Sequence, residues 1–222
     1  MFIGHYAPAL VAATLPRAPR LGLLFVGAQL VDIAFFGFVL GGIESMRITP
    51  GITRMNGLDL YDMPYTHSLV GGIIWGGLAI IIFQQLTRNL AGALILGGVV
   101  VSHWCADLLV HRPDLTLAGT PPALGLGLWN YPMIEMPFEL GLVGASLGFY
   151  LRRTRHVVGM PTYWPWALGV VMFSIQIYNW FSPEPEALTQ SLPLSALFAF
   201  ALLAWLAHKT AQTRMLKGAG EN

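Results

Sequence analysis

Two histidines and an aspartate share one helix face at the end of a hydrophobic segment. His103, Asp107 and His111 are spaced four residues apart, and the run before them, 90–101, is apolar enough to lie in lipid. A charged side chain near the bilayer centre costs about 2.5–3.5 kcal/mol on insertion scales, so ionisable residues in such segments usually face the protein interior and mark a functional site. Imidazole nitrogen and carboxylate oxygen bind divalent metals, and this spacing lets His103 and Asp107 reach one ion or one bridged pair of ions.

Three earlier segments offer further ligands of the same kinds. Counted from Arg17 and Arg20 at a rise of 1.5 Å per residue, His5 and Asp32 both lie about 18 Å above the basic side of the membrane. His67 falls near the start of the next helix. Nitrogen and oxygen ligands suit zinc, manganese or iron better than calcium. We therefore predict a site for a divalent metal, zinc first, with the ligands His5, Asp32, His67, His103 and Asp107.

Each candidate also has a structural interpretation without metal. His103 would then only hydrogen-bond within its own helix or to a neighbouring one, and Asp32 would pair with a buried aromatic or amide group. His67 would face interfacial water. His111 and Arg112 would be solvated or would face lipid headgroups rather than take part in chemistry.

The composition is that of an integral membrane protein. Hydrophobic residues make up 55% of the 222 residues and charged residues 10%, and the mean hydropathy is +0.61. A helix needs about 20 residues to cross about 30 Å of hydrocarbon, and six apolar stretches approach that length: roughly 21–43, 65–87, 89–110, 132–151, 164–182 and 191–208. We predict an all-α transmembrane bundle and a single domain over 1–222, with a short N-terminal half-helix (1–16), six membrane-spanning helices (17–208) and a mobile tail (209–222).

The basic residues lie mainly on one side of the predicted membrane topology. The loops on one side contain Arg17, Arg20, Arg88, Arg152, Arg153, Arg155, Lys209, Arg214 and Lys217, and those on the other contain only Arg47, Arg54 and Arg112. By the positive-inside rule, the first side and the C-terminus are cytoplasmic. The loops 44–64, 111–130 and 183–190 then face outward, and the candidate ligands lie in the outer half of the bundle.

Several other chemistries lack support in the sequence. It contains no His-Glu-x-x-His motif, no phosphate-binding glycine loop, no dinucleotide fingerprint and no nucleophile elbow. The basic residues are spread along one membrane face, which argues against nucleic-acid binding. Cys105 is the only cysteine, so neither an internal disulfide nor a multi-cysteine metal site can form.

Three features resemble a bacterial family of inner-membrane metal-dependent hydrolases, some of which belong to the LexA-regulated damage response. These are the sequence YTHSL at 65–69, the pair His103 and Asp107, and the early His5. A closer resemblance, over residues 4 to about 155, is to a group of bacterial integral membrane proteins of unassigned activity that share AQLVD at 28–32, SHW at 102–104, HRPD at 111–114 and GLGLWN at 125–130. The resemblance implies a bacterial inner-membrane location, and it supports the ligand assignments more than any one reaction. The broader family tends to carry two acids around position 32, where this chain has Gln29 and Asp32, so the pattern does not support a second metal ion.

We predict a membrane-embedded metal-dependent hydrolase whose substrate is a lipid or lipid-linked ester or phosphoester near the outer leaflet. A bound divalent ion lowers the pKa of its water toward about 7 and so generates hydroxide at neutral pH. Glu135 and Glu139, spaced four residues apart, would orient or deprotonate this water, and Arg112 would steady an anionic group of the substrate. Membrane lipids are the expected partners.

A non-catalytic role is the alternative. An accessory or assembly subunit of a larger membrane complex would also carry small-residue helix faces, such as the glycines at 71, 72, 76 and 77 and at 141, 144 and 148. In that case His67 or His103 would ligate a haem or chlorophyll, or would only hydrogen-bond internally. A transporter is less well supported, because the two halves of the sequence lack a matched pair of broken helices.

Overall fold

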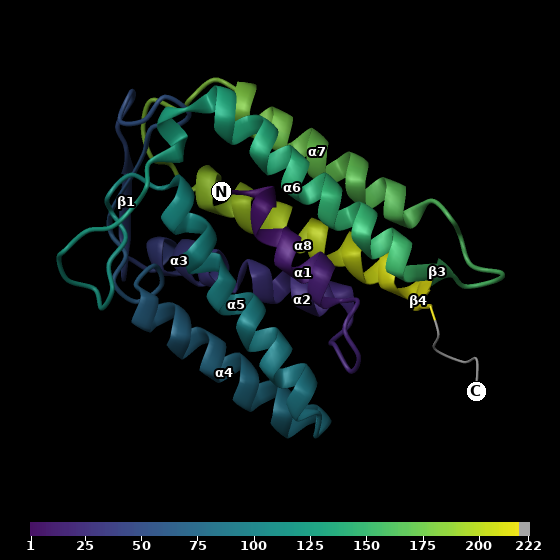
Figure 1. Cartoon of the computed structure of the whole chain (residues 1–222). Coiled ribbons are helices and arrows are strands. Elements are labelled where there is room, and N and C mark those ends of the chain that lie inside the picture. The colour runs from purple at the N-terminus through teal and green to yellow at the C-terminus, as the bar shows by residue number, and fades with distance from the viewer. Residues whose placement is uncertain (218–222) are drawn as a thin grey trace.

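The apolar stretches of the sequence form long helices that pack side by side, with short strands and loops at the two ends of these helices (Figure 1). This computed structural model describes residues 1–217. The helices are η1 (Ile3–His5), α1 (Tyr6–Ala12), α2 (Leu21–Ala28), α3 (Leu30–Leu40), α4 (Leu69–Thr87), α5 (Leu90–Val110), η2 (Leu128–Asn130), α6 (Pro132–Arg153), α7 (Trp164–Phe181) and α8 (Ser191–Gln212). The strands are β1 (Ser45–Ile48), β2 (Leu58–Asp62), β3 (Thr154–His156) and β4 (Arg214–Leu216). The described chain is therefore mainly helical, as predicted, with two small two-stranded sheets in addition.

The number of membrane spans differs from the sequence prediction. Three helices, α4, α5 and α8, are long and apolar enough to cross a membrane, and the pair α2 and α3, which meet at 52°, would form a fourth span if they cross together. α6 and α7 are more polar, because α6 carries Glu135 and Glu139 and α7 carries Gln176 and Asn179. Residues 1–217 thus support three or four spans, and the predicted bundle of six is not confirmed.

Helices α4 and α5 begin at side-chain caps and form an antiparallel pair. The Ser68 hydroxyl accepts the backbone N–H of Gly71 at 3.0 Å, and the Asn89 side chain accepts that of Gly92 at 3.0 Å. Between the helices, Arg88 takes a left-handed backbone conformation (φ 57°) that ends α4 and reverses the chain. α5 therefore returns along α4 and carries the candidate ligands at its far end.

The stretch 21–43, which the sequence predicts as one helix, is broken at Gln29. This residue is fully buried between α2 and α3, and its Nε2 donates a hydrogen bond to the carbonyl of Phe2 at 3.0 Å. α3 begins at Leu30, so Asp32 lies in its first turn. The break explains how an acid from a long apolar stretch reaches the polar cluster described below.

The predicted N-terminal half-helix forms as η1 and α1 and is enclosed by other helices. α1 packs against α2, α5 and α6, and Ile3, Tyr6 and Leu10 are fully buried. Tyr6 stacks on Phe25 of α2 with 4.3 Å between the ring centroids. The N-terminal segment therefore brings His5 to the middle of the bundle.

The core lies where several helices meet around α1. Leu10 of α1, Phe25 of α2, Val143 of α6, Leu168 of α7 and Leu203 of α8 are buried in one cluster. Many large apolar side chains on the outer faces of α4 and α7 remain exposed. Exposed apolar faces of this extent are expected where helices contact lipid.

Residues 44–64 and 111–130 cover one end of the bundle, which we name the outer end after its predicted orientation. β1 and β2 pair antiparallel there, and the loop after α5 folds back so that Leu115 pairs with Leu124. At the opposite end β3 pairs antiparallel with β4. Residues 209–216, predicted as part of a mobile tail, instead complete α8 and form β4. The rest of the predicted tail, 218–222, lies outside the described residues.

We expect the contact between α4 and α5 to depend on Gly76. A Cβ at position 76 would lie 2.9 Å from the Val101 side chain and 3.2 Å from the Gly97 carbonyl oxygen, whereas a Cβ at position 77 would meet no atom within 4 Å. Gly76→Leu should therefore lower the free energy of unfolding by about 1–3 kcal/mol through overpacking. Thermal unfolding in detergent, followed by circular dichroism, measures the effect. Gly77→Leu is the matched control, and equal destabilisation by both substitutions would contradict this packing.

Candidate metal centre

The polar face of α5 points into the bundle and meets side chains from three other segments. His103 and Asp107 are buried on this face, and His111 is buried directly after the end of the helix. η1, α3 and the loop before α4 each add one residue. We name the resulting group the His/Asp cluster: His5, Asp32, His67, His103, Asp107 and His111. The structure thus brings together all the ligands predicted from the sequence and adds His111.

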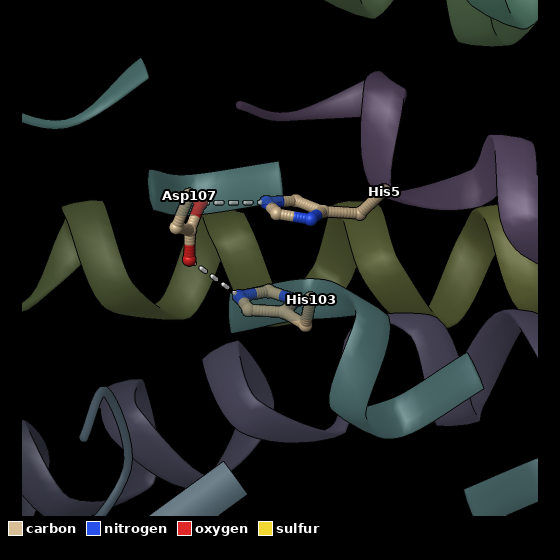
Figure 2. Close-up of side chains that lie close together, drawn as sticks. All are labelled: His5, His103 and Asp107. Carbon is tan, nitrogen blue, oxygen red and sulfur yellow. Dashed lines mark ion pairs between the residues drawn. The ribbon is translucent and has the colours of Figure 1, made fainter. Parts of the chain in front are cut away.

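Asp107 lies at the centre of this cluster, and its two carboxylate oxygens face different histidines. Oδ1 is 3.0 Å from Nε2 of His5 and 3.5 Å from Nε2 of His111. Oδ2 is 3.0 Å from Nε2 of His103 and 3.7 Å from Nε2 of His67. Figure 2 shows the two shortest contacts, one from each oxygen, and the stacked rings of His5 and His103, whose centroids are 3.7 Å apart.

Asp32 completes one side of the cluster. Its Oδ1 is 3.2 Å from Nε2 of His67 and 3.5 Å from Nε2 of His103. Two groups of three residues consequently offer ligand atoms within 4.8 Å of one another: His5, His103 and Asp107, and Asp32, His67 and His103. These separations suit ligands of one ion, since metal–nitrogen and metal–oxygen bonds are about 2.0–2.2 Å long. The His/Asp cluster could therefore hold a divalent metal ion.

Two histidines of the cluster are held from behind through Nδ1. His103 donates its Nδ1–H to the carbonyl of Ala28 at 2.8 Å. His67 donates its Nδ1–H to the Thr66 hydroxyl at 2.9 Å, and this hydroxyl donates in turn to the buried carboxylate of Glu44 at 2.7 Å. Such partners fix the ring and leave Nε2 available as a metal ligand.

His111 is held in the same way beyond the end of α5. Its Nδ1–H donates to Asp114 at 2.9 Å, and the ring of Trp129 packs beside it with 4.3 Å between centroids. Burial lowers the pKa of His111, but the carboxylates of Asp107 and Asp114 outweigh this effect and raise its pKa above the ordinary value. The surroundings of His111 therefore favour a positive charge. The residue is only 2% exposed, so its interpretation as solvated or headgroup-facing is wrong.

Arg112 is bound to carboxylates of the protein itself. Its guanidinium pairs with Asp59 of β2 through Nη2 and approaches Asp114 through Nε at 3.4 Å. Asp59 also pairs with Arg47 of β1 at 2.6 Å. These contacts join the β1–β2 hairpin to the loop that holds His111. They do not favour the predicted role of Arg112 in steadying a substrate anion, because both sides of its guanidinium already face carboxylates.

The two glutamates of α6 have different surroundings, although the sequence predicts the same role for either. Oε1 of Glu139 accepts the backbone N–H groups of Phe2 at 2.7 Å and Gly4 at 2.8 Å, and Oε2 accepts Nε2 of Gln176 at 3.1 Å. Gln176 in turn accepts the N–H of Ile3 at 3.3 Å. Glu139 and Gln176 therefore hold the start of the N-terminal segment in place.

Glu135 faces a cavity beside the His/Asp cluster. It is fully buried, and within the described residues no group donates a hydrogen bond to either carboxylate oxygen. The cavity has a volume of about 360 Å³ and extends from Asp32 and Asp107 toward Met55 and Asn56 and the outer halves of α7 and α8. Apolar side chains form most of its remaining wall, among them Phe35, Phe36, Leu60, Trp129, Leu192 and Phe200. An acid that accepts no hydrogen bond and lies close to the carboxylate of Glu139 thus faces a mainly apolar space next to the candidate metal site.

No family model matches the chain, and neither a curated protein nor a solved structure matches it. The resemblance to bacterial inner-membrane hydrolases therefore stays a prediction. The candidate metal centre rests on its own geometry.

Several residues of the centre are not singled out as site residues by sequence reasoning. For His111 a signal exists, because it continues the four-residue spacing of His103 and Asp107. Glu44 and Gln176 carry no comparable signal. Their partners lie 22 and 37 residues away along the chain, so only the folded arrangement reveals these contacts.

Glu139→Ala should destabilise the protein more than Glu135→Ala. The first substitution leaves two buried donors and one partly buried donor without an acceptor, and each buried group costs about 1–3 kcal/mol. The second substitution removes a carboxylate that accepts no hydrogen bond. Thermal unfolding in detergent and metal-free buffer compares the two variants, and Glu139→Gln, which keeps one acceptor oxygen, should fall between them. An equally large loss for Glu135→Ala would contradict these assignments.

Proposed function

We propose that the protein is a membrane-embedded metal-dependent hydrolase that cleaves a lipid or lipid-linked phosphoester at the outer end of the bundle. One observation carries this proposal. The buried His/Asp cluster, in which His67, His103 and His111 are anchored through Nδ1, adjoins a mainly apolar cavity in which no group donates a hydrogen bond to the Glu135 carboxylate. A cluster that served stability alone would need no such cavity, whereas a substrate does.

The donor atoms of the cluster suit zinc, with manganese or iron as alternatives, because they are imidazole nitrogen and carboxylate oxygen. When bound, such an ion lowers the pKa of a water molecule toward about 7 and polarises the ester. His67, His103 and Asp107 would hold the ion, with Asp32 and His5 as further ligands. The Nδ1–H groups of His67 and His103 point away from the cluster, which leaves neutral Nε2 atoms to bind it.

Glu135 is the proposed proton acceptor. Because no protein donor occupies its carboxylate, it can take a proton from the attacking water while the water oxygen forms its bond to phosphorus. The ester P–O bond breaks, and Glu135 then returns the proton to the leaving oxygen. Both oxygens of Glu139 already accept hydrogen bonds, so Glu139 positions the N-terminal segment instead. Arg112 acts through Asp114, which it helps to hold behind His111.

The surroundings of the cavity support a lipid substrate. α4, α5 and α8 are apolar enough to cross a membrane, and the cavity lies between α3, α7 and α8 with a mainly apolar wall. An acyl or isoprenoid chain gains about 25 cal/mol for each Å² of apolar surface that it buries there, while its phosphoester reaches the cluster. With the basic loops and the C-terminus in the cytoplasm of a bacterium, the cavity would open toward the outer leaflet of the inner membrane.

An accessory subunit that binds haem or chlorophyll through histidine is the alternative, and the cluster favours it less. Nε2 of His103 is 3.0 Å from Asp107 and 3.5 Å from Asp32, and Nδ1 is occupied by the Ala28 carbonyl. Neither nitrogen has room in front of it for a macrocycle. The exposed apolar faces of the helices fit contact with lipid as well as contact with a larger complex.

Metal content and lipid hydrolysis, measured on the same samples, test the proposal. Detergent-purified protein should contain zinc, manganese or iron by elemental analysis. It should also release product from a mixture of phosphatidylethanolamine, phosphatidylglycerol and an isoprenoid diphosphate, detected by mass spectrometry. His103→Ala should lose both properties, because it removes a central ligand. His208→Ala, at an exposed position near the other end of α8, is the matched control and should keep both. Metal and hydrolysis that survive His103→Ala would refute the proposal.

Glu135→Gln separates proton transfer from metal binding. The amide keeps the size of the side chain but cannot take the proton, so hydrolysis should fall about 100- to 10,000-fold. Metal content should not change, because Glu135 is not among the proposed ligands. Hydrolysis at the wild-type rate in this variant would exclude Glu135 as the proton acceptor.

A further inference from the structure

The geometry points to a second divalent-cation position in the His/Asp cluster, bridged to the first by the carboxylate of Asp107 and completed by His5 and His111. This inference rests on the proposed metal site and adds an ion to it. It goes against the sequence pattern around Asp32, which does not support a second ion.

The contacts of Asp107 divide the cluster into two sides. Oδ2 faces His103 at 3.0 Å and His67 at 3.7 Å. Oδ1 faces His5 at 3.0 Å, the Met1 amine at 3.4 Å and His111 at 3.5 Å. Figure 2 shows that the two oxygens point to different rings, one to His5 and the other to His103. Paired metal ions in hydrolytic sites lie about 3.5–4 Å apart. A carboxylate that gives one oxygen to each ion of such a pair would have neighbours arranged in this way.

A single zinc ion cannot use all of these ligands. The His/Asp cluster presents six side chains, whereas zinc takes about four ligands. The mutually close ligand atoms fall into two groups, one with His5 and the other with Asp32 and His67. An ion bound by one group leaves the ligands that only the other group contains without a cation.

His103 belongs to both groups but has one nitrogen to offer. Its Nδ1–H donates to a backbone carbonyl, so only Nε2 can bind an ion. If His103 serves the first position, the second needs another ligand, and His111 is the residue that approaches Oδ1 of Asp107 there. Asp114 holds Nδ1 of His111 from behind, as carboxylates hold the histidines of many metal sites.

The charge around the cavity also favours two ions. Asp32, Asp107, Glu135 and Glu139 line it, and no lysine or arginine is present among its described lining residues. The amine of Met1 lies 3.4 Å from Asp107. Buried carboxylates are costly unless cations or protons compensate them. One divalent ion and the Met1 amine together carry three positive charges against the four carboxylates, and a second ion supplies the positive charge that is still missing.

Manganese binding by the full chain tests this inference. Protein in detergent is stripped with a chelator, loaded with Mn²⁺ and desalted, and its manganese is measured by elemental analysis and electron paramagnetic resonance. We expect about two Mn²⁺ per chain and an exchange-coupled spectrum, as for two ions with a bridging ligand. His111→Gln should reduce the content to about one Mn²⁺ per chain and give the spectrum of an isolated ion. His208→Gln is the matched control and should behave as the wild type.

The outcomes separate this inference from the proposed function. Wild-type protein with about one Mn²⁺ per chain and no exchange coupling would overturn the second position and leave the first intact. Wild-type protein that binds neither Mn²⁺ nor Zn²⁺ would overturn both. The wild-type spectrum does not depend on any variant, so the test stands if His111→Gln fails to fold, and His5→Gln then replaces it. An unchanged coupled spectrum in both folded variants would overturn the assignment of His5 and His111 as ligands.

Discussion

A carboxylate that is buried away from water must be compensated by positive charge or by hydrogen-bond donors. Asp107 is such a carboxylate, and the packing of several segments depends on bringing partners to it. It is only 1% exposed and lies on a helix apolar enough to cross a membrane. Four imidazoles from three segments of the chain approach it: His5 from η1, His67 from the loop before α4, and His103 and His111 from α5 and its end. The buried path of the N-terminal segment and the close packing of α4 on α5 bring these rings to one place.

The same requirement extends to the residues behind the cluster. Thr66 and Asp114 hold imidazole rings through Nδ1. Glu139 and Gln176 accept the backbone N–H groups at the start of η1, and Gln29 donates to a carbonyl of the same segment. Lipid offers no partners for such groups, so each must find one within the protein. These contacts would keep the ligand atoms within reach of an ion, although the residues that make them lie outside the His/Asp cluster.

The His/Asp cluster adjoins a cavity, which a set of buried ion pairs alone would not require. Its polar end is formed by carboxylates and imidazoles, and its wall by aromatic and aliphatic side chains of α3, α7 and α8. Under the proposed function, a bound metal ion would hold the phosphoester of an amphiphile at the polar end, and the hydrocarbon chain would lie along the wall. Glu135 is the one acid of α6 without a hydrogen-bond donor in the described structure, and it lines this cavity. Glu139, in contrast, accepts three hydrogen bonds and holds the N-terminal segment.

The sequence by itself determined that the chain is mainly helical and apolar enough for a membrane, and that His103 and Asp107 share a helix face, because hydropathy and four-residue spacing are local properties. It also indicated which other residues have the donor atoms of metal ligands. Only the tertiary structure decided that the first long apolar stretch breaks at Gln29, that His111 is buried beside Asp107, and that Glu139 is occupied whereas Glu135 is not. Each of these outcomes depends on a partner that folding brings close from another segment or another turn of the chain. Because water is excluded there, the buried polar group needs that partner.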